Sequence, residues 1–144
     1  SDGAGAEVIV IPAGGVKKPI PSPGFEDGDQ YFHMDGPAVW DFATEAFPQA
    51  VRGVLERVGH SLDDVSLTIA HQANLNIIKA GMENLGLPME KTFTNLHKYG
   101  NPSAAACAIA LDEAHRSGKF GKGDHIVLVA FGAGLTWAAA AVRW

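Results

Sequence analysis

Hydrophobic residues recur along the chain with two different spacings, and the two alternate. Helical spacing, with an apolar residue every three or four positions, covers residues 39–58 and 74–85. Unbroken apolar runs at residues 65–70 and 126–131 are typical of strands that are buried on both faces. Strands that alternate with helices in this way predict an α/β domain whose sheet is mostly parallel.

Proline, glycine and serine mark the expected ends of these elements. Pro48 lies inside the first helical stretch and predicts a kink or a break at Phe47. Gly59 is expected to end that stretch. Further along, Ser103 is a suitable N-cap for a helix over residues 104–117.

Two more strands and one long loop complete the expected fold. A short β-branched run at residues 6–11 predicts a strand. The turn at residues 132–134 leads into a last strand, residues 135–144, which we expect to be antiparallel to its neighbour. Residues 13–34 are rich in proline and glycine, which predicts a surface loop. Four strands with one reversed make a thin sheet, and this indicates a missing partner.

Composition and charge narrow the possible functions. Of the 144 residues, 47% are hydrophobic and 19% charged, which is typical of a globular protein. The net charge of −5 does not support binding to nucleic acid, which needs a basic face. No run approaches the ~18 consecutive apolar residues of a membrane helix, and the start lacks the features of a signal peptide. The single cysteine is compatible with a reducing compartment, so we expect a cytoplasmic location.

Two polar residues stand where a predicted strand or β-prone run gives way to a helix. His71 closes the strand at residues 65–70, and Asn101 follows the β-prone run at residues 92–95. Alone, His71 would more often be a structural histidine, and Asn101 a turn residue with left-handed backbone. Because α/β proteins place their chemistry at the carboxyl ends of strands, the two corners together favour one shared site.

Several short motifs, in order along the chain, resemble the β-ketoacyl synthase III family of the thiolase fold. They are Ser1-Asp2-Gly3-Ala4-Gly5-Ala6, Pro12-Ala13-Gly14-Gly15, Met34-Asp35-Gly36, His71-Gln72-Ala73-Asn74-Leu75, Tyr99-Gly100-Asn101-Pro102-Ser103-Ala104-Ala105, Gly123-Asp124 and Phe131-Gly132-Ala133-Gly134-Leu135-Thr136-Trp137. The resemblance covers essentially the whole chain, but only the C-terminal part of such an enzyme. It implies the second half of a thiolase-type αβαβα sandwich, here a single domain over residues 1–144 without its first strand.

The resemblance also implies a reaction and a set of site residues. Family members condense an acyl group, held on a cysteine of the first half, with a malonyl thioester that loses CO2. His71 and Asn101 would stabilise the decarboxylation transition state, and the backbone N–H of Ala133 would belong to the oxyanion hole of the acyl-enzyme. The tunnel for the pantetheine arm would be lined by Gly36, Trp40 and Asn74. The expected substrates are CoA and acyl-carrier pantetheine thioesters, with no other cofactor.

The remaining cysteine and histidines suggest no second site. Cys107 falls within an Ala-rich helix with no adjacent basic residue to lower its pKa, so we expect an inert buried thiol. The other histidines lack metal-ligand spacing, so no metal site is expected. They are His33, His60, His97, His115 and His125.

The expected docking surface for acyl carrier protein is atypical. Family enzymes that use the carrier commonly place an Arg at the position of Asn76 on the helix after the His motif. That helix here also carries Glu83 and Asn84, and only Lys79 keeps a positive charge. The electrostatic steering of an acidic carrier is therefore expected to be weak. This leaves either a CoA-linked acceptor or an unusual carrier open.

The hypothesis is a condensing enzyme of fatty acid biosynthesis that is a homodimer when intact. This chain alone is expected to be inactive, because the cysteine lies in the missing half or on a partner chain. Two alternatives stay open. The chain could be a non-catalytic subunit that completes a partner's active site, or part of a thiolase-fold acyltransferase of secondary metabolism.

Overall fold

A computed structural model describes all 144 residues, and the chain divides into two compact units. The first unit comprises Ser1–Asp41 and Gly132–Thr136, and the second comprises Phe42–Phe131 and Trp137–Trp144. No helix is both long and apolar enough to span a membrane.

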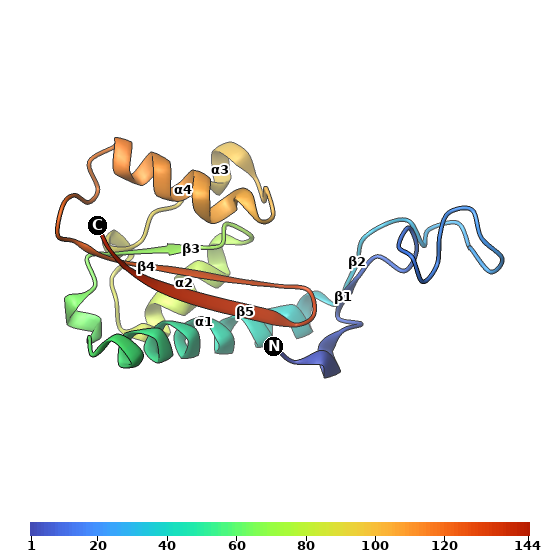
Figure 1. The fold of residues 1–144 in the computed structure, drawn as a ribbon, viewed down its shortest axis with the longest axis horizontal. Helices are drawn as coiled ribbons and strands as arrows, with labels where there is room; N and C mark the ends of the chain where they lie inside the picture. The colour runs from blue at the N-terminus through green and yellow to red at the C-terminus, as the bar shows by residue number, and fades with distance from the viewer. The chain divides into compact units, whose positions relative to one another are not determined.

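The main sheet has three strands, in the order β3 (Leu67–Ala70), β4 (His125–Gly132) and β5 (Thr136–Arg143) (Figure 1). β3 and β4 are parallel, with Leu67 opposite Ile126 and Ala70 opposite Val129. β5 returns beside β4 as a hairpin. An isolated parallel bridge between Thr68 and Thr92 extends the sheet on the other side of β3. The mixed, mostly parallel sheet with a terminal antiparallel hairpin is thus confirmed.

Helices cover both faces of this sheet. α1 (Gly36–Val58) and α2 (Leu75–Leu85) lie on one face, and α4 (Ala105–Arg116) lies on the other (Figure 1). Because strand side chains point alternately to opposite faces, the strands serve two cores. Ala70, Val127 and Val129 pack with α1 and α2. Leu67 and Ile69 of β3 pack with α4 on the opposite face.

The short elements connect these layers. Three are single 3₁₀ turns: η1 (Gly3–Gly5), η2 (Leu62–Asp64) and η3 (Met89–Lys91). α3 (Leu96–Tyr99) is one turn long and comes directly before Gly100 and Asn101.

The sequence predicted a kink or a break at Phe47, and the break is wrong, because α1 runs without interruption through Pro48. Proline has no N–H, so the carbonyl of Thr44 loses the donor that a helix would normally supply. The side chain of Asn84 on α2 donates to that carbonyl instead, over 3.5 Å. Phe47 itself is fully buried, which anchors the helix at this point.

The predicted N-cap at Ser103 is also wrong. α4 begins at Ala105, and its N-cap position is Ala104, which makes no side-chain capping bond. Ser103 instead has a positive φ of 53°, and its N–H donates to the side chain of Asn101. The polar side chain that organises this turn is therefore Asn101.

In the first unit, the strand expected at residues 6–11 is shorter and does not belong to the main sheet. β1 (Ile9–Val10) pairs antiparallel with β2 (His33–Met34), an element absent from the sequence-based expectation. Between them, the loop is held by Lys18, whose ammonium contacts the Asp29 carboxylate. Asp2 and Leu135 exchange both backbone hydrogen bonds, at 2.8 and 2.7 Å.

Candidate functional site

His71 lies at the carboxyl end of β3 and continues its pairing with β4. Its backbone N–H donates to Val129 O at 2.8 Å. The half-buried ring meets Phe131 edge to face, with centroids 5.7 Å apart. Burial lowers the pKa of His71 from the usual histidine value, which favours the neutral imidazole. Neither ring nitrogen makes a hydrogen bond within the chain, which leaves a ring N–H available to a ligand.

Asn101 is held in a turn that leaves its amide nitrogen unused. Gly100 before it has a positive φ of 66°, which suits glycine. The Asn101 side-chain oxygen accepts from the Ser103 N–H at 3.0 Å. Since the oxygen is engaged, the group without a partner on this exposed residue is the NH2, which can only donate. Both predicted site residues therefore present an unpaired N–H donor.

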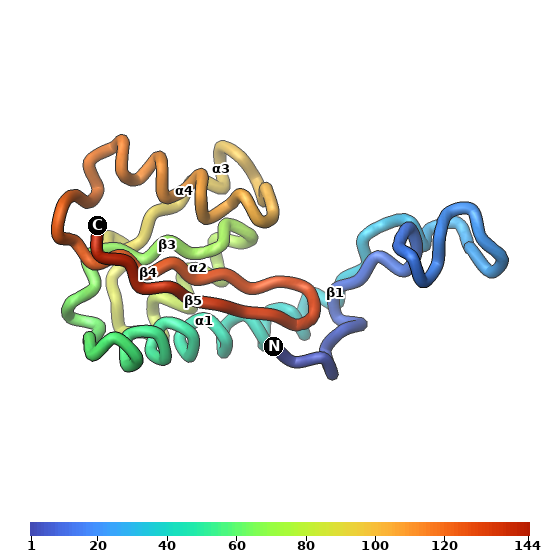
Figure 2. Tube along the Cα trace, viewed as in Figure 1, coloured from blue at the N-terminus to red at the C-terminus, as the bar shows by residue number.

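Gln72 connects the two corners through its side chain. Figure 2 shows the path of the chain from β3 to α2 and from α3 to α4, on which the two corners lie. Gln72 is 1% exposed. Its side-chain nitrogen donates to Ala70 O at 2.8 Å and Phe93 O at 3.3 Å. Its oxygen accepts from the Asn95 N–H at 3.0 Å. Gln72, the residue after His71, is thus bonded to the segment that leads into α3 and Asn101. His71 and Asn101 make no hydrogen bond with each other.

Asn74 is the N-cap of α2. Its side-chain oxygen accepts from the Asn76 N–H at 2.9 Å, which satisfies one of the free donors at the start of the helix. As with Asn101, the oxygen is used and the NH2 group remains free at an exposed position.

The other predicted site residues lie in the first unit. Gly36 is the first residue of α1, and Trp40 follows on the same helix with 40% of its surface exposed. Ala133 lies in the turn between β4 and β5, where its carbonyl accepts from the Thr136 hydroxyl at 3.0 Å. His71, Asn74 and Asn101 belong to the second unit.

Cys107 has the surroundings of an inert thiol, as expected. It is half-buried on α4, and its sulfur lies 3.7 Å from Val129 O. Burial raises the pKa of the thiol, so the nucleophilic thiolate is disfavoured.

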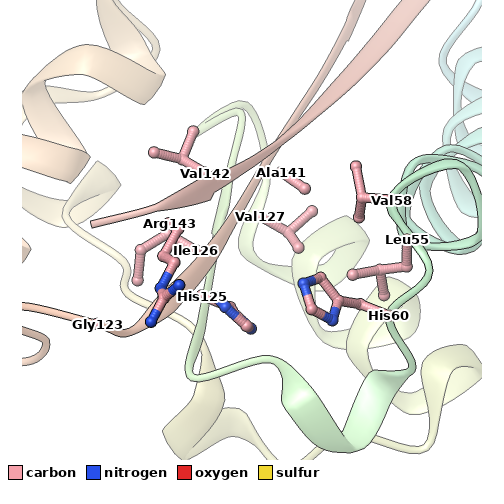
Figure 3. A pocket seen from close by; sticks show the side chains of 10 residues that line it. All are labelled: Leu55, Val58, His60, Gly123, His125, Ile126, Val127, Ala141, Val142 and Arg143. Carbon is pink, nitrogen blue, oxygen red and sulfur yellow. The ribbon is translucent and has the colours of Figure 1, made fainter.

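Sequence reasoning assigned no site to one cavity of the second unit, which lies away from His71. It has a volume of about 440 Å³ and is lined mostly by apolar side chains of α1, β4 and β5 (Figure 3). His60 and His125 meet there, with ring centroids 4.3 Å apart. The cavity includes the start of β4, whereas His71 lies at the carboxyl end of the parallel strand β3. It is therefore at the opposite end of these strands from the predicted site.

The α2 residues of the predicted carrier surface have two different roles. Asn76, Lys79 and Glu83 are exposed. Asn84 is occupied within the fold: its side chain donates to Thr44 O, and its carbonyl accepts from Arg52 at 3.2 Å. Only the first three are free to meet a partner.

Comparison with known proteins shows which family this chain belongs to. Residues 55–144 match the model described as 3-oxoacyl-[acyl-carrier-protein (ACP)] synthase III C terminal. The whole chain is 44% identical to the β-ketoacyl-[acyl-carrier-protein] synthase III of Rhodopirellula baltica and 45% identical to that of Caldanaerobacter subterraneus subsp. tengcongensis. It covers 42% and 44% of those proteins, respectively.

A solved structure gives the same result. The whole chain superposes on 44% of the crystal structure of β-ketoacyl-[acyl carrier protein] synthase III from Thermus thermophilus, with a TM-score of 0.86 and 39% identity. The thiolase-type fold that the motifs implied is thereby confirmed. The chain spans less than half the length of each of these relatives. It belongs to the 3-oxoacyl-[acyl-carrier-protein (ACP)] synthase III C-terminal family.

Proposed function

We propose that this chain supplies the decarboxylation site of a β-ketoacyl-[acyl-carrier-protein] synthase III. The enzyme would condense an acyl group from acyl-CoA with a malonyl thioester in fatty acid biosynthesis. The observation that carries the proposal is the pair of unpaired N–H donors at two corners joined by Gln72. The relatives' names support the same reaction class.

The chemistry needs donors where negative charge develops. When the malonyl thioester loses CO2, the electron pair of the broken C–C bond moves onto the thioester oxygen as an enolate. The His71 ring N–H and the Asn101 NH2 would donate to that oxygen, each lowering the barrier by roughly 3–4 kcal/mol. The enolate carbon then attacks the acyl thioester on a cysteine outside this chain, and the cysteine leaves as thiolate.

A neutral His71 suits this step. A neutral imidazole donates a hydrogen bond without transferring its proton to the enolate, and the pKa of His71 is already lowered by burial. The edge of Phe131 against the ring limits its rotation. The substrates would be CoA and acyl-carrier pantetheine thioesters, and the reaction as drawn needs no further cofactor.

The remaining predicted residues would bind rather than react. The Ala133 N–H would contribute to the oxyanion hole of the acyl-enzyme. Gly36, Trp40 and Asn74 would line the channel for the pantetheine arm, where the free NH2 group of Asn74 could donate to an amide carbonyl. We further propose that the intact enzyme is a homodimer.

The test uses His71→Ala and Asn101→Ala in the full-length enzyme, with CO2 release and cysteine acylation measured separately. Each variant should lower the decarboxylation rate by about 10²–10³-fold, the effect of removing one oxyanion donor. Acylation should stay close to wild type, because both donors act on the second step. Equal loss of acylation would contradict this division of roles.

Two further variants test whether Asn101 acts as a hydrogen-bond donor or only maintains the shape of its turn. Asn101→Asp keeps the side-chain oxygen that accepts from Ser103 but lacks the NH2 donor, so it should be as slow in decarboxylation as Asn101→Ala. His97→Ala removes an exposed histidine from α3 and should leave both steps unchanged. A fast Asn101→Asp enzyme would show that only the turn geometry matters.

A further inference from the structure

The carboxylate of Glu113 on α4 accepts hydrogen bonds from side chains at both ends of α3. Its Oε2 accepts from the Asn95 side-chain nitrogen at 2.8 Å, just before α3 begins. Its Oε1 accepts from the Tyr99 hydroxyl at 2.6 Å and the Lys98 ammonium at 2.5 Å, in the last residues of α3. One carboxylate therefore holds the whole turn that leads into Gly100 and Asn101.

Gln72 also holds this turn, through its bond to Asn95. Asn95, which is 3% exposed, uses its backbone N–H for Gln72 and its side chain for Glu113. The hydrogen bonds form a continuous path that starts beside His71, at Gln72, and runs through Asn95 to Glu113. From Glu113 the path continues to Tyr99, the residue before Gly100. All of these residues belong to the second unit.

α3 needs such external support. A helix of four residues is too short to be stable by itself, because nucleation costs more than one turn of hydrogen bonds returns. The following backbone is unusual at two positions, Gly100 and Ser103, which both have positive φ. Hydrogen bonds to an ionised acceptor are about twice as strong as neutral ones. The Ser103 N–H orients the Asn101 side chain within its turn, whereas the position of the turn as a whole depends on the contacts that hold α3.

The carboxylate stays ionised in the working range of pH. The hydrogen bonds from Lys98, Tyr99 and Asn95 lower the pKa of Glu113 to about 2. An exposed ion pair between Lys98 and Glu113 would by itself contribute little. What distinguishes Glu113 from such a pair is its bond to the buried side chain of Asn95.

We propose that Glu113 is a positioning residue: it holds α3 between α4 and Gln72, and so places the Asn101 amide at the His71 corner. The proposal rests on the function proposed above for His71 and Asn101. It assigns Glu113 no contact with substrate.

The experiment is a double-mutant cycle in the full-length enzyme, with Glu113→Ala and Asn101→Ala singly and together. Glu113→Ala should lower kcat for malonyl decarboxylation by about tenfold, since small displacements of a reacting group cost this much or more. KM for the malonyl thioester and the rate of cysteine acylation should not change. In the double variant, Glu113→Ala should cause no further loss, because the group it positions is already gone.

Two other variants refine the result. Glu113→Gln keeps one acceptor oxygen, so its activity should lie between those of wild type and Glu113→Ala. Asp112→Asn is the matched control: it removes the neighbouring acid on α4, whose bond is to Arg116 of the same helix, and should leave kcat unchanged. If Glu113→Ala does not fold, Tyr99→Phe, which removes only the hydroxyl bond, takes its place in the cycle with a smaller loss expected.

The outcomes separate this proposal from the one it rests on. Additive losses in the double variant, or an equal loss of acylation, would overturn the positioning role and leave Glu113 as a general stabiliser of the fold. Unchanged decarboxylation in Asn101→Ala alone would overturn the proposed function, whatever Glu113 does. Non-additive losses confined to decarboxylation would support both.

Discussion

At the scale of single residues, the candidate site depends on which atoms of each side-chain amide already make a hydrogen bond within the protein. The oxygens of Asn101 and Asn74 each accept a backbone N–H two residues later, which leaves two NH2 groups free. Gln72 differs, because both ends of its amide are bonded inside the protein. The same chemical group is therefore a candidate ligand contact in two positions and a structural brace in the third.

His71 should titrate below the ordinary histidine range. Desolvation disfavours its charged form, so its pKa in the folded protein lies below 6.5. Between that pKa and 6.5 the unfolded chain binds more protons, so the contribution of His71 to the free energy of unfolding rises with pH in that interval. NMR titration of the intact protein, with the signal assigned through His71→Ala, measures this pKa. A value of 6.5 or above would contradict the buried, neutral ring.

At the scale of elements, the contact between α1 and α2 depends on one glycine. A Cβ at Gly81 of α2 would come within 1.8 Å of the Phe47 ring, which is fully buried. The same contact lies close to Pro48, where Asn84 of α2 donates to the Thr44 carbonyl, to which proline has no N–H to donate. The close approach of α1 and α2 therefore gives the Phe47 ring room against Gly81 and brings Asn84 within reach of the Thr44 carbonyl.

Gly81→Ala should destabilise the intact protein by about 2 kcal/mol or more, because an extra methyl group in a packed core forces the ring out of place. This outweighs the gain of about 0.5–1 kcal/mol that alanine offers inside a helix. The matched control is Gly53→Ala on α1, where a Cβ meets nothing within 4 Å, and it should be neutral or stabilising. Urea unfolding of both variants measures the difference, and a Gly81→Ala protein as stable as the control would contradict the close contact.

At the scale of the whole molecule, the chain corresponds to less than half of its relatives. The proposed reaction needs a cysteine that this chain does not supply, because Cys107 is a half-buried thiol with a raised pKa. Substrate delivery is also a property of the whole enzyme. The exposed α2 surface carries Asn76, Lys79 and Glu83, so its local charge is close to balanced.

Asn76→Arg in the full-length enzyme should raise kcat/KM for a malonyl group on an acidic acyl carrier protein. An added positive charge at an exposed rim position speeds association with an acidic partner, and salt screens the gain. Malonyl-CoA, which lacks the carrier's acidic helix, should react unchanged. Asn76→Gln is the uncharged control. No gain at low salt would indicate that the carrier docks elsewhere.

Sequence alone determined the features that depend on near neighbours along the chain. The spacing of apolar residues predicted α1, α2, β3 and β4, because each periodicity reflects which side of one element faces a core. It also placed His71 and Asn101 at element ends, and the short motifs identified the family. These are properties of contiguous segments, so no knowledge of distant contacts was needed.

Only the tertiary structure decided which polar groups are bonded and which are free. Gln72 and Asn95 are 23 residues apart, Asn95 and Glu113 are 18 apart, and Thr44 and Asn84 are 40 apart. Local propensity cannot report such pairs, and for this reason a break at Phe47 was wrongly expected and the contacts of Glu113 were not anticipated. The pairing of β1 with β2 escaped prediction for the same reason: a hydrogen bond between distant residues exists only after the chain has folded.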